Sequence, residues 1–193
     1  KEKIVLDYLA SNHAILVQSM GYSFFHQSFY DYTLARFFTS RGGSFFDKIQ
    51  KSFQGIEIRS TVKAVLEFDK EHNLNNYSND LRLIFNSSKI RQHIKLLTLS
   101  LIAMSEEVSE CEREAVFNTC SKDMRCLSFF LRGVHNDKWF TTLKPVVLPL
   151  VCTLNPKSEL LYPIANYLSV ASFRHVKEVF EIIKNLVYTN VQL

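Results

Sequence analysis

The side chains most able to do chemistry are gathered in residues 22–38, YSFFHQSFYDYTLARFF. His26 follows two phenylalanines, Ser28 comes two residues later, and Asp31 comes three residues after Ser28. An imidazole in this setting can be packed in a core, bind a metal, take part in acid–base catalysis or contact an external ligand. These uses require different neighbours, so the surrounding residues decide between them.

Neither metal binding nor catalysis fits the residues around His26. A zinc site needs several close ligands, and nearby only Asp31 lies at ligand spacing. The segment has no nucleophile elbow, and Ser28 is better explained as the start of a helix. We therefore expect no metal site and no catalytic residue. Two uses stay open: a packed ring with local hydrogen bonds, and contact with a ligand that the chain does not itself contain.

Ser28 and Asp31 fit the S-x-x-D pattern of a helix N-terminus, in which the hydroxyl and the carboxylate satisfy free amides of the first turn. The helix is expected to end at Arg41-Gly42-Gly43, because glycine commonly follows a helix. His26 would then lie near the positive end of the helix dipole, where free amides favour an anion. A neutral imidazole there can donate one N–H to a phosphate oxygen.

The residues before this helix predict a short hairpin. Residues 4–10, IVLDYLA, are typical of the end of a helix, and residues 13–19 and 22–26 indicate two short strands joined by a turn at Met20-Gly21. The order helix, hairpin, helix corresponds to the C-terminal part of a winged-helix module. We assign this module to residues 1–42.

Residues 43–193 carry almost only helical patterns. With 5 Gly and 4 Pro in 193 residues, the chain has too few turn formers for a β-sandwich or barrel. Helix pairs are expected to start roughly every 33 residues, within the range of helical solenoids, but without a repeated side-chain consensus; the predicted starts lie near Ser44, Tyr77, Cys111, Lys138 and Val176. The predicted fold is therefore mainly α: a partial winged helix followed by an irregular HEAT-like α-solenoid of antiparallel helix pairs. Four prolines are expected to mark bends or boundaries in the fourth pair: Pro145, Pro149, Pro156 and Pro163.

The segment FFHQSFYDYTLARFF resembles a motif in the winged-helix domain of NACHT-type STAND NTPases, the group that includes NOD-like immune receptors and bacterial antiphage sensors. The family pattern is aromatic-x-His-x-[ST]-Phe-x-[DE]-[YF]-x-x-[AG], which is matched here by Phe24, His26, Ser28, Phe29, Asp31, Tyr32 and Ala35. The resemblance implies that His26 contacts the β-phosphate of ADP and helps to hold a closed, inactive state. It also implies a capping role for Ser28 and Asp31 and a packing role for Phe24, Phe29 and Tyr32.

The chain departs from an entire STAND NTPase because it contains no GxxxxGK[ST] phosphate loop; Gly42-Gly43 is followed by Ser44-Phe45. An acidic signature for a magnesium site is also missing. Since the chain starts at Lys1 and ends directly after an apolar helical pattern, we expect it to be part of a longer protein. The ATPase core, with ADP or ATP and Mg²⁺, would lie upstream of residue 1.

Other classes of function find little support. The net charge of +4 is spread along the chain, and no secretory leader or membrane-spanning stretch is visible. We therefore expect a cytoplasmic protein that binds neither nucleic acid nor membrane. The four cysteines, none in a CxxC pair, are expected to be reduced and mostly buried. Asp69, Glu71 and His72 are close in sequence but are interpreted as solvated charge on a polar helix face, which argues against a self-contained hydrolase.

The leading hypothesis is a non-catalytic segment that couples the nucleotide state of an upstream P-loop motor to a sensing array. Its expected partners are that motor domain in the same chain, a protein or peptide ligand on the helical array, and other copies of the protein in an active oligomer. The alternative is a helical-repeat scaffold for protein–protein interaction with no link to a nucleotide. Most aromatic residues of the array, including Phe129, Phe130, Trp139 and Phe140, are expected to pack in its core.

Overall fold

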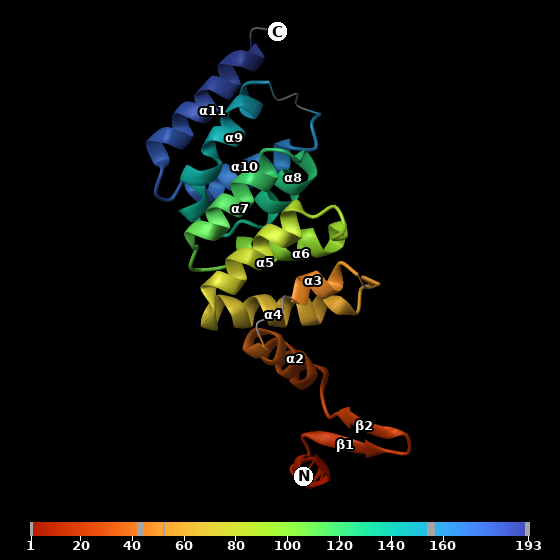
Figure 1. Cartoon of the computed structure of the whole chain (residues 1–193). Coiled ribbons are helices and arrows are strands. Elements are labelled where there is room, and N and C mark those ends of the chain that lie inside the picture. The colour runs from red at the N-terminus through yellow and green to blue at the C-terminus, as the bar shows by residue number, and fades with distance from the viewer. Residues whose placement is uncertain (1, 42–44, 52, 154–156, 192–193) are drawn as a thin grey trace. The chain divides into compact units, whose positions relative to one another are not determined.

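The computed structural model describes residues 2–41, 45–51, 53–153 and 157–191. The described residues are mainly helical and contain one antiparallel two-stranded sheet (Figure 1). The chain divides into two compact units, residues 1–80 and residues 81–193. The boundary predicted between residues 42 and 43 lies outside the described residues, and the contacts group the next helices with residues 1–41.

The first unit begins with helix α1 (Glu2–Ser11), strands β1 (Ile15–Gln18) and β2 (Gly21–Phe24), and helix α2 (Gln27–Arg41). This is the predicted order of helix, hairpin and helix. Arg41 is the last described residue of α2, and the glycines predicted to end this helix, Gly42 and Gly43, are outside the described residues.

The hairpin differs from the prediction at its turn. Gln18 pairs with Gly21, so the two turn residues are Ser19 and Met20 rather than Met20 and Gly21. Gly21 has φ of +147°, a conformation that residues with a Cβ rarely adopt. A glycine at the start of the second strand therefore closes this turn.

Helices α3 (Phe45–Ile49) and α4 (Ile58–His72) follow, and α5 (Leu74–Asn86) crosses the boundary between the units. Helix α2 packs mainly on α4. The core of this unit is supplied largely by α3 and α4, whose spacing of apolar residues matches one face of a helix; its buried apolar side chains include Phe45, Phe46, Ile49, Val62, Val65 and Leu66.

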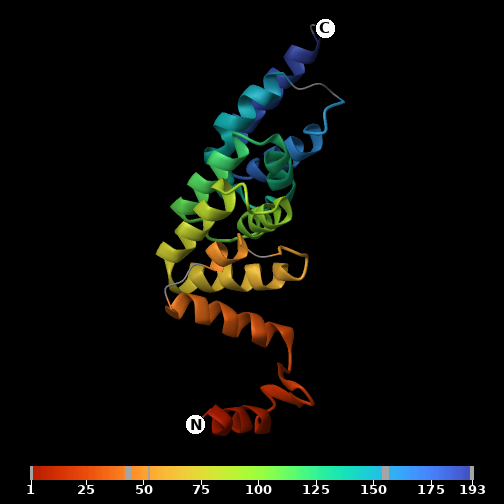
Figure 2. The ribbon, with the colours of Figure 1, turned by 45° about the vertical axis from the view of Figure 1, so that its right-hand side comes forward.

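The second unit consists of the rest of α5 and six further α-helices in the described residues, with a short 3₁₀-helix η1 (Asp137–Trp139) before α9. The helices are α6 (Gln92–Ala103), α7 (Glu110–Cys120), α8 (Met124–Gly133), α9 (Phe140–Cys152), α10 (Leu161–Ala171) and α11 (Val176–Val191). Helices α6, α8 and α10 pack in one row, and α7, α9 and α11 pack in a second row (Figure 1, and turned by 45° in Figure 2). Helix α8 also packs on α7, and α10 on α9 and α11, so the two rows share a core.

The core of the second unit is rich in aromatic residues. Phe130, Trp139 and Phe140 are fully buried, as predicted, whereas Phe129 is 39% exposed. The rings of Phe130 and Trp139 meet edge to face, with their centroids 4.9 Å apart. The Tyr167 hydroxyl donates to the Phe140 carbonyl oxygen at 2.7 Å, which satisfies its polar end within the core.

Some of the predicted starts of helix pairs agree with the structure and others do not. Val176 begins α11, and the predicted starts near Cys111 and Lys138 fall at the beginning of α7 and in η1. Tyr77 instead lies inside α5, and Ser44 is outside the described residues.

The prolines mark fewer boundaries than expected. Pro145 and Pro149 both lie inside α9, and Pro163 is the third residue of α10, where its missing N–H costs little. Pro156 is outside the described residues. Packing on neighbouring helices keeps α9 continuous although two of its amide donors are absent.

Candidate functional site

His26 lies at the start of helix α2, where its main chain begins the helical hydrogen bonds. Its carbonyl oxygen accepts from the backbone N–H of Phe29 at 3.0 Å and of Tyr30 at 3.3 Å. His26 is therefore the residue that caps the helix, immediately before its first residue Gln27. The free amides of the first turn surround this position.

The ring of His26 points one nitrogen at the helix. The backbone N–H of Ser28 donates to Nδ1 of His26 at 3.2 Å, and the Ser28 hydroxyl also contacts Nδ1. Because an amide can only donate, Nδ1 is the acceptor and the neutral ring carries its proton on Nε2. The side chain is exposed, and Nε2 has no hydrogen bond to any of the described residues. One N–H donor of His26 is thus directed away from the helix and is available to a ligand.

The capping roles predicted for Ser28 and Asp31 need correction. Ser28 is the second residue of α2, and the group that accepts its amide is the imidazole of His26. Asp31 is 4% exposed and lies inside the helix. Its carboxylate accepts from Gln27 Nε2 at 3.0 Å and from Thr61 Oγ1 of α4 at 2.6 Å. Asp31 therefore joins α2 to α4, a contact between residues thirty positions apart that no local pattern reveals.

The aromatic residues of the motif contact one another but do not form a core. Phe24 meets Phe29 at 6.5 Å and Tyr30 at 5.6 Å between ring centroids, and Tyr32 meets Phe68 of α4 at 5.8 Å. Phe29 and Tyr32 nevertheless remain 53% and 51% exposed. The packing predicted for them is incomplete within the described residues.

The whole segment of residues 2–41 exposes much apolar surface. Its buried apolar side chains among the described residues are Ile15 and Ala35. The large apolar side chains that it exposes are Ile4, Val5, Tyr8, Leu16, Val17, Met20, Tyr22, Phe25, Phe29, Tyr30, Tyr32 and Phe37. A surface of this kind is typical of a segment that docks against another protein surface.

The prediction for Asp69 is also wrong. Asp69, Glu71 and His72 were predicted to lie on a solvated polar face, and only the side chains of Glu71 and His72 are exposed. Asp69 itself is 3% exposed; it accepts a hydrogen bond from the Thr39 hydroxyl and is hydrogen-bonded to Asp80. Burial raises the pKa of its carboxyl, which outweighs the lowering by Thr39, Asp80 and the charge of His72. Asp69 thus gives α2 and α4 a second polar connection.

The structure shows no cluster of three or more histidine, cysteine, aspartate or glutamate side chains that could hold a metal ion within the residues it describes. Over the same residues, none of the helices combines the length and the apolar character needed to span a bilayer.

Comparisons with known proteins found no match: no family model, no curated protein and no solved structure is similar to this chain.

Proposed function

We propose that this chain is a non-catalytic regulatory segment of a STAND-type ATPase, which couples the nucleotide state of an upstream P-loop motor to a helical sensing array. In this proposal residues 1–42 are the C-terminal part of the winged helix, and residues 43–193 are an irregular HEAT-like solenoid. The motor, which would bind ADP or ATP with Mg²⁺, belongs to the same polypeptide upstream of residue 1.

The observation that carries the proposal is the orientation of His26. Its Nδ1 is held by the Ser28 amide, so the proton on Nε2 faces outward at the positive end of α2. A donor fixed in this way loses little side-chain freedom when it binds an anion. In the proposed closed state, Nε2–H donates to the β-phosphate of ADP.

The exposed apolar surface of residues 2–41 supports a protein partner for this segment. Phe25 next to His26 is 64% exposed, and Val17 in the hairpin is 68% exposed. Both positions would be covered by the upstream motor domain when it closes. The nucleotide contact would then lie at the edge of an apolar interface, where water is excluded and a charged hydrogen bond is strengthened.

The connection from His26 into the array runs through α2. Asp31 and Thr39 of this helix bind Thr61 and Asp69 of α4, so a shift of α2 moves polar groups that are buried against α4. Coupling of this kind requires that both nucleotide and array ligand bias one two-state element. We assign that role to α2. A protein or peptide on the array would favour the open state, in which the protein forms its active oligomer.

The test is the rate of ADP release from the intact protein that carries the motor. His26→Asn keeps an acceptor for the Ser28 amide, since asparagine is a good capping residue, but its shorter side chain cannot place an N–H donor at the position of Nε2. Loss of a hydrogen bond to a charged group corresponds to release that is about 10- to 100-fold faster. Stopped-flow measurement with a fluorescent ADP analogue gives this rate.

His135→Ala is the matched control, because it removes an exposed histidine of the second unit that lies outside the proposed contact. We expect the control to release ADP at the wild-type rate. If His26→Asn also releases ADP at that rate, His26 does not contact the nucleotide and the proposal fails.

A further inference from the structure

A hollow in the second unit is lined mainly by groups that donate hydrogen bonds. Its volume is about 610 Å³, and it is bounded by α7, by η1 and the start of α9, and by the loop before α11. The residues that line it are Arg113, Asp137, Lys138, Thr141, Thr142, Arg174 and His175. Three cationic side chains and one carboxylate give it a net positive charge even when His175 is neutral.

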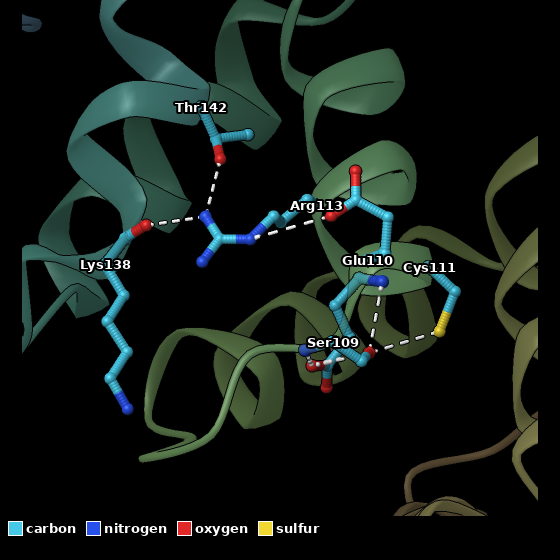
Figure 3. Close-up of polar contacts among 7 residues, drawn as sticks. Ser109, Glu110, Cys111, Arg113, Lys138 and Thr142 are labelled. Carbon is cyan, nitrogen blue, oxygen red and sulfur yellow. Dashed lines mark hydrogen bonds and ion pairs between the residues drawn. The ribbon is translucent and has the colours of Figure 1, made fainter.

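The side chain of Arg113 is positioned by hydrogen bonds within the protein. Its Nη1 donates to the Lys138 carbonyl oxygen at 2.7 Å and to the Thr142 hydroxyl at 2.9 Å (Figure 3). The guanidinium lies 6.0 Å from the ring centre of Trp139. Its ion pair with Glu110 is long, at 4.0 Å, and the Glu110 side chain is 92% exposed. Because exposed pairs of this kind are weak, the charge of Arg113 is largely uncompensated.

Arg113 and Thr142 both keep donors for a ligand. No hydrogen bond to a described residue occupies Nη2 of Arg113, whose two N–H groups remain. Thr142 accepts from Arg113, so its own O–H proton is free to be donated. A positioned guanidinium beside a hydroxyl donor is the arrangement that proteins use to bind phosphate oxygens.

Arg174 and His175 add donors from a second side of the hollow. Arg174 is 75% exposed and pairs with Asp137, with 3.4 Å between Nε and Oδ2. His175 is held by stacking on Phe140, with ring centroids 4.5 Å apart, and by Glu178, 3.4 Å from Nδ1. Lys138 contributes less, because its ammonium group donates to the Glu106 carbonyl oxygen.

We infer that this hollow is a binding site for a phosphate group carried by a small molecule. Its donors come from separate elements and so can surround a tetrahedral anion, whereas a planar carboxylate would need only one guanidinium fork. The volume exceeds that of a free anion, which leaves room for the remainder of a phosphorylated ligand. The inference depends on residues of the second unit alone and does not rest on the proposed role of His26.

The experiment titrates the 193-residue chain with inorganic phosphate, phosphoserine and acetate at constant ionic strength and measures affinity by calorimetry. We expect saturable binding of both phosphate compounds and tighter binding of phosphoserine, with no saturable binding of acetate. Arg113→Lys keeps the charge but loses the fork, and Arg174→Gln removes an exposed charge; each should weaken phosphate binding about 10-fold.

Arg132→Ala is the matched control, because it removes an exposed arginine of α8 that does not line this hollow. It should leave the phosphate affinity unchanged. Equal affinities in all three arginine variants, or saturable binding of acetate as tight as that of phosphate, would overturn the inference. Circular dichroism verifies that each variant is folded, and Arg174→Gln keeps the test decisive if Arg113→Lys unfolds.

Discussion

Residues 2–41 and the helical unit after residue 80 have similar shares of apolar residues but use them differently. In the helical unit, helices such as α8 bury one apolar face, with Leu127, Phe130 and Leu131 fully covered. In α2, phenylalanines and tyrosines occur on several sides, and α4 covers only one of them. Apolar content alone therefore does not identify a core; the angular distribution of the residues decides whether one neighbour can bury them.

The two regions are therefore stabilised by different interactions. Burial within the helical unit supplies most of the free energy that orders it. The N-terminal segment is joined to α4 by polar connections and by the contact of Tyr32 with Phe68, and it leaves many of its apolar side chains exposed. Substitutions chosen in both regions test this difference.

The largest effect is expected for Phe130→Ala. The ring is fully buried against Trp139, and loss of a buried phenylalanine lowers the free energy of unfolding by about 3–5 kcal/mol. Urea denaturation followed by the fluorescence of Trp139, the single tryptophan, measures the change. Phe129→Ala is the control. Because Phe129 is 39% exposed, its truncation should lower the free energy of unfolding much less. Equal costs would contradict a core built around Phe130.

Thr61→Val should have the next largest effect. It removes the hydroxyl that donates to the buried carboxylate of Asp31 and should lower the free energy of unfolding by about 1–3 kcal/mol. Circular dichroism at increasing urea concentration follows the loss of helix. Thr33→Val, at an exposed site on α2, should stay within about 0.5 kcal/mol of wild type. A Thr61 variant as stable as this control would show that the polar connection does not hold α2.

Asp123→Ala tests a helix cap in the helical unit and should cost about 1 kcal/mol at neutral pH. The Asp123 carboxylate accepts from the backbone N–H of Arg125 at 2.8 Å and of Cys126 at 3.4 Å. Partial burial raises the pKa of Asp123, but these hydrogen bonds, with that from the Cys126 thiol, lower it overall. The stability that the Asp123 carboxylate contributes is therefore present above the pKa of the unfolded chain, about 3.9. It is lost as the pH falls through the lower pKa of the folded chain.

Unfolding of the Asp123 variant and of wild type across this acid range gives the measurement. The two free energies should converge as the pH falls. A difference that stays constant with pH would contradict the assigned cap.

Asp69→Asn should show the opposite pH dependence in the first unit. Burial raises the pKa of Asp69, so the folded chain holds this proton to a higher pH than the unfolded chain does. The stability that the group contributes is then greatest below the unfolded value of about 3.9 and falls as the pH rises through the folded value. As the pH rises over this range, the free energy of unfolding of the variant should increase relative to that of wild type. Urea titrations at several pH values measure this difference. If the variant instead became more stable relative to wild type as the pH falls, burial would not control the pKa of the Asp69 carboxyl.

The smallest effect is expected for Phe25→Ala in this chain alone. Phe25 is 64% exposed, and its truncation should change the free energy of unfolding by less than about 0.5 kcal/mol. Urea denaturation followed by circular dichroism is the measurement, with Phe130→Ala as the reference. A cost of several kcal/mol would mean that residues 2–41 have a core of their own, and the comparison would fail.

Local signals predicted much of the fold. Apolar periodicity predicted the helical character, alternation near Gly21 predicted the hairpin, and the spacing after Val176 located the start of α11. Such features depend on residues that are neighbours in sequence. For the same reason the S-x-x-E pattern at Ser109 and Glu112 could have been recognised as a capping box, which the structure contains.

The candidate site was less predictable. His26 was identified from its motif, but its role as the cap depends on backbone geometry that the S-x-x-D pattern misplaced by two residues. The partners of Asp31 and Asp69 come from other helices, thirty positions away in the case of Thr61. The donors around Arg113 also come from separate elements, so only the folded structure brings them together.

The two rows of helices in the second unit have a consequence for how this unit folds. Each helix of a row packs on the helix two places along the chain, so a contact within a row spans one intervening helix, as between Arg113 and Thr142, which are 29 positions apart. Closing loops of this length costs less entropy than joining the two ends of the unit, so contacts within a row can form before the whole unit is assembled.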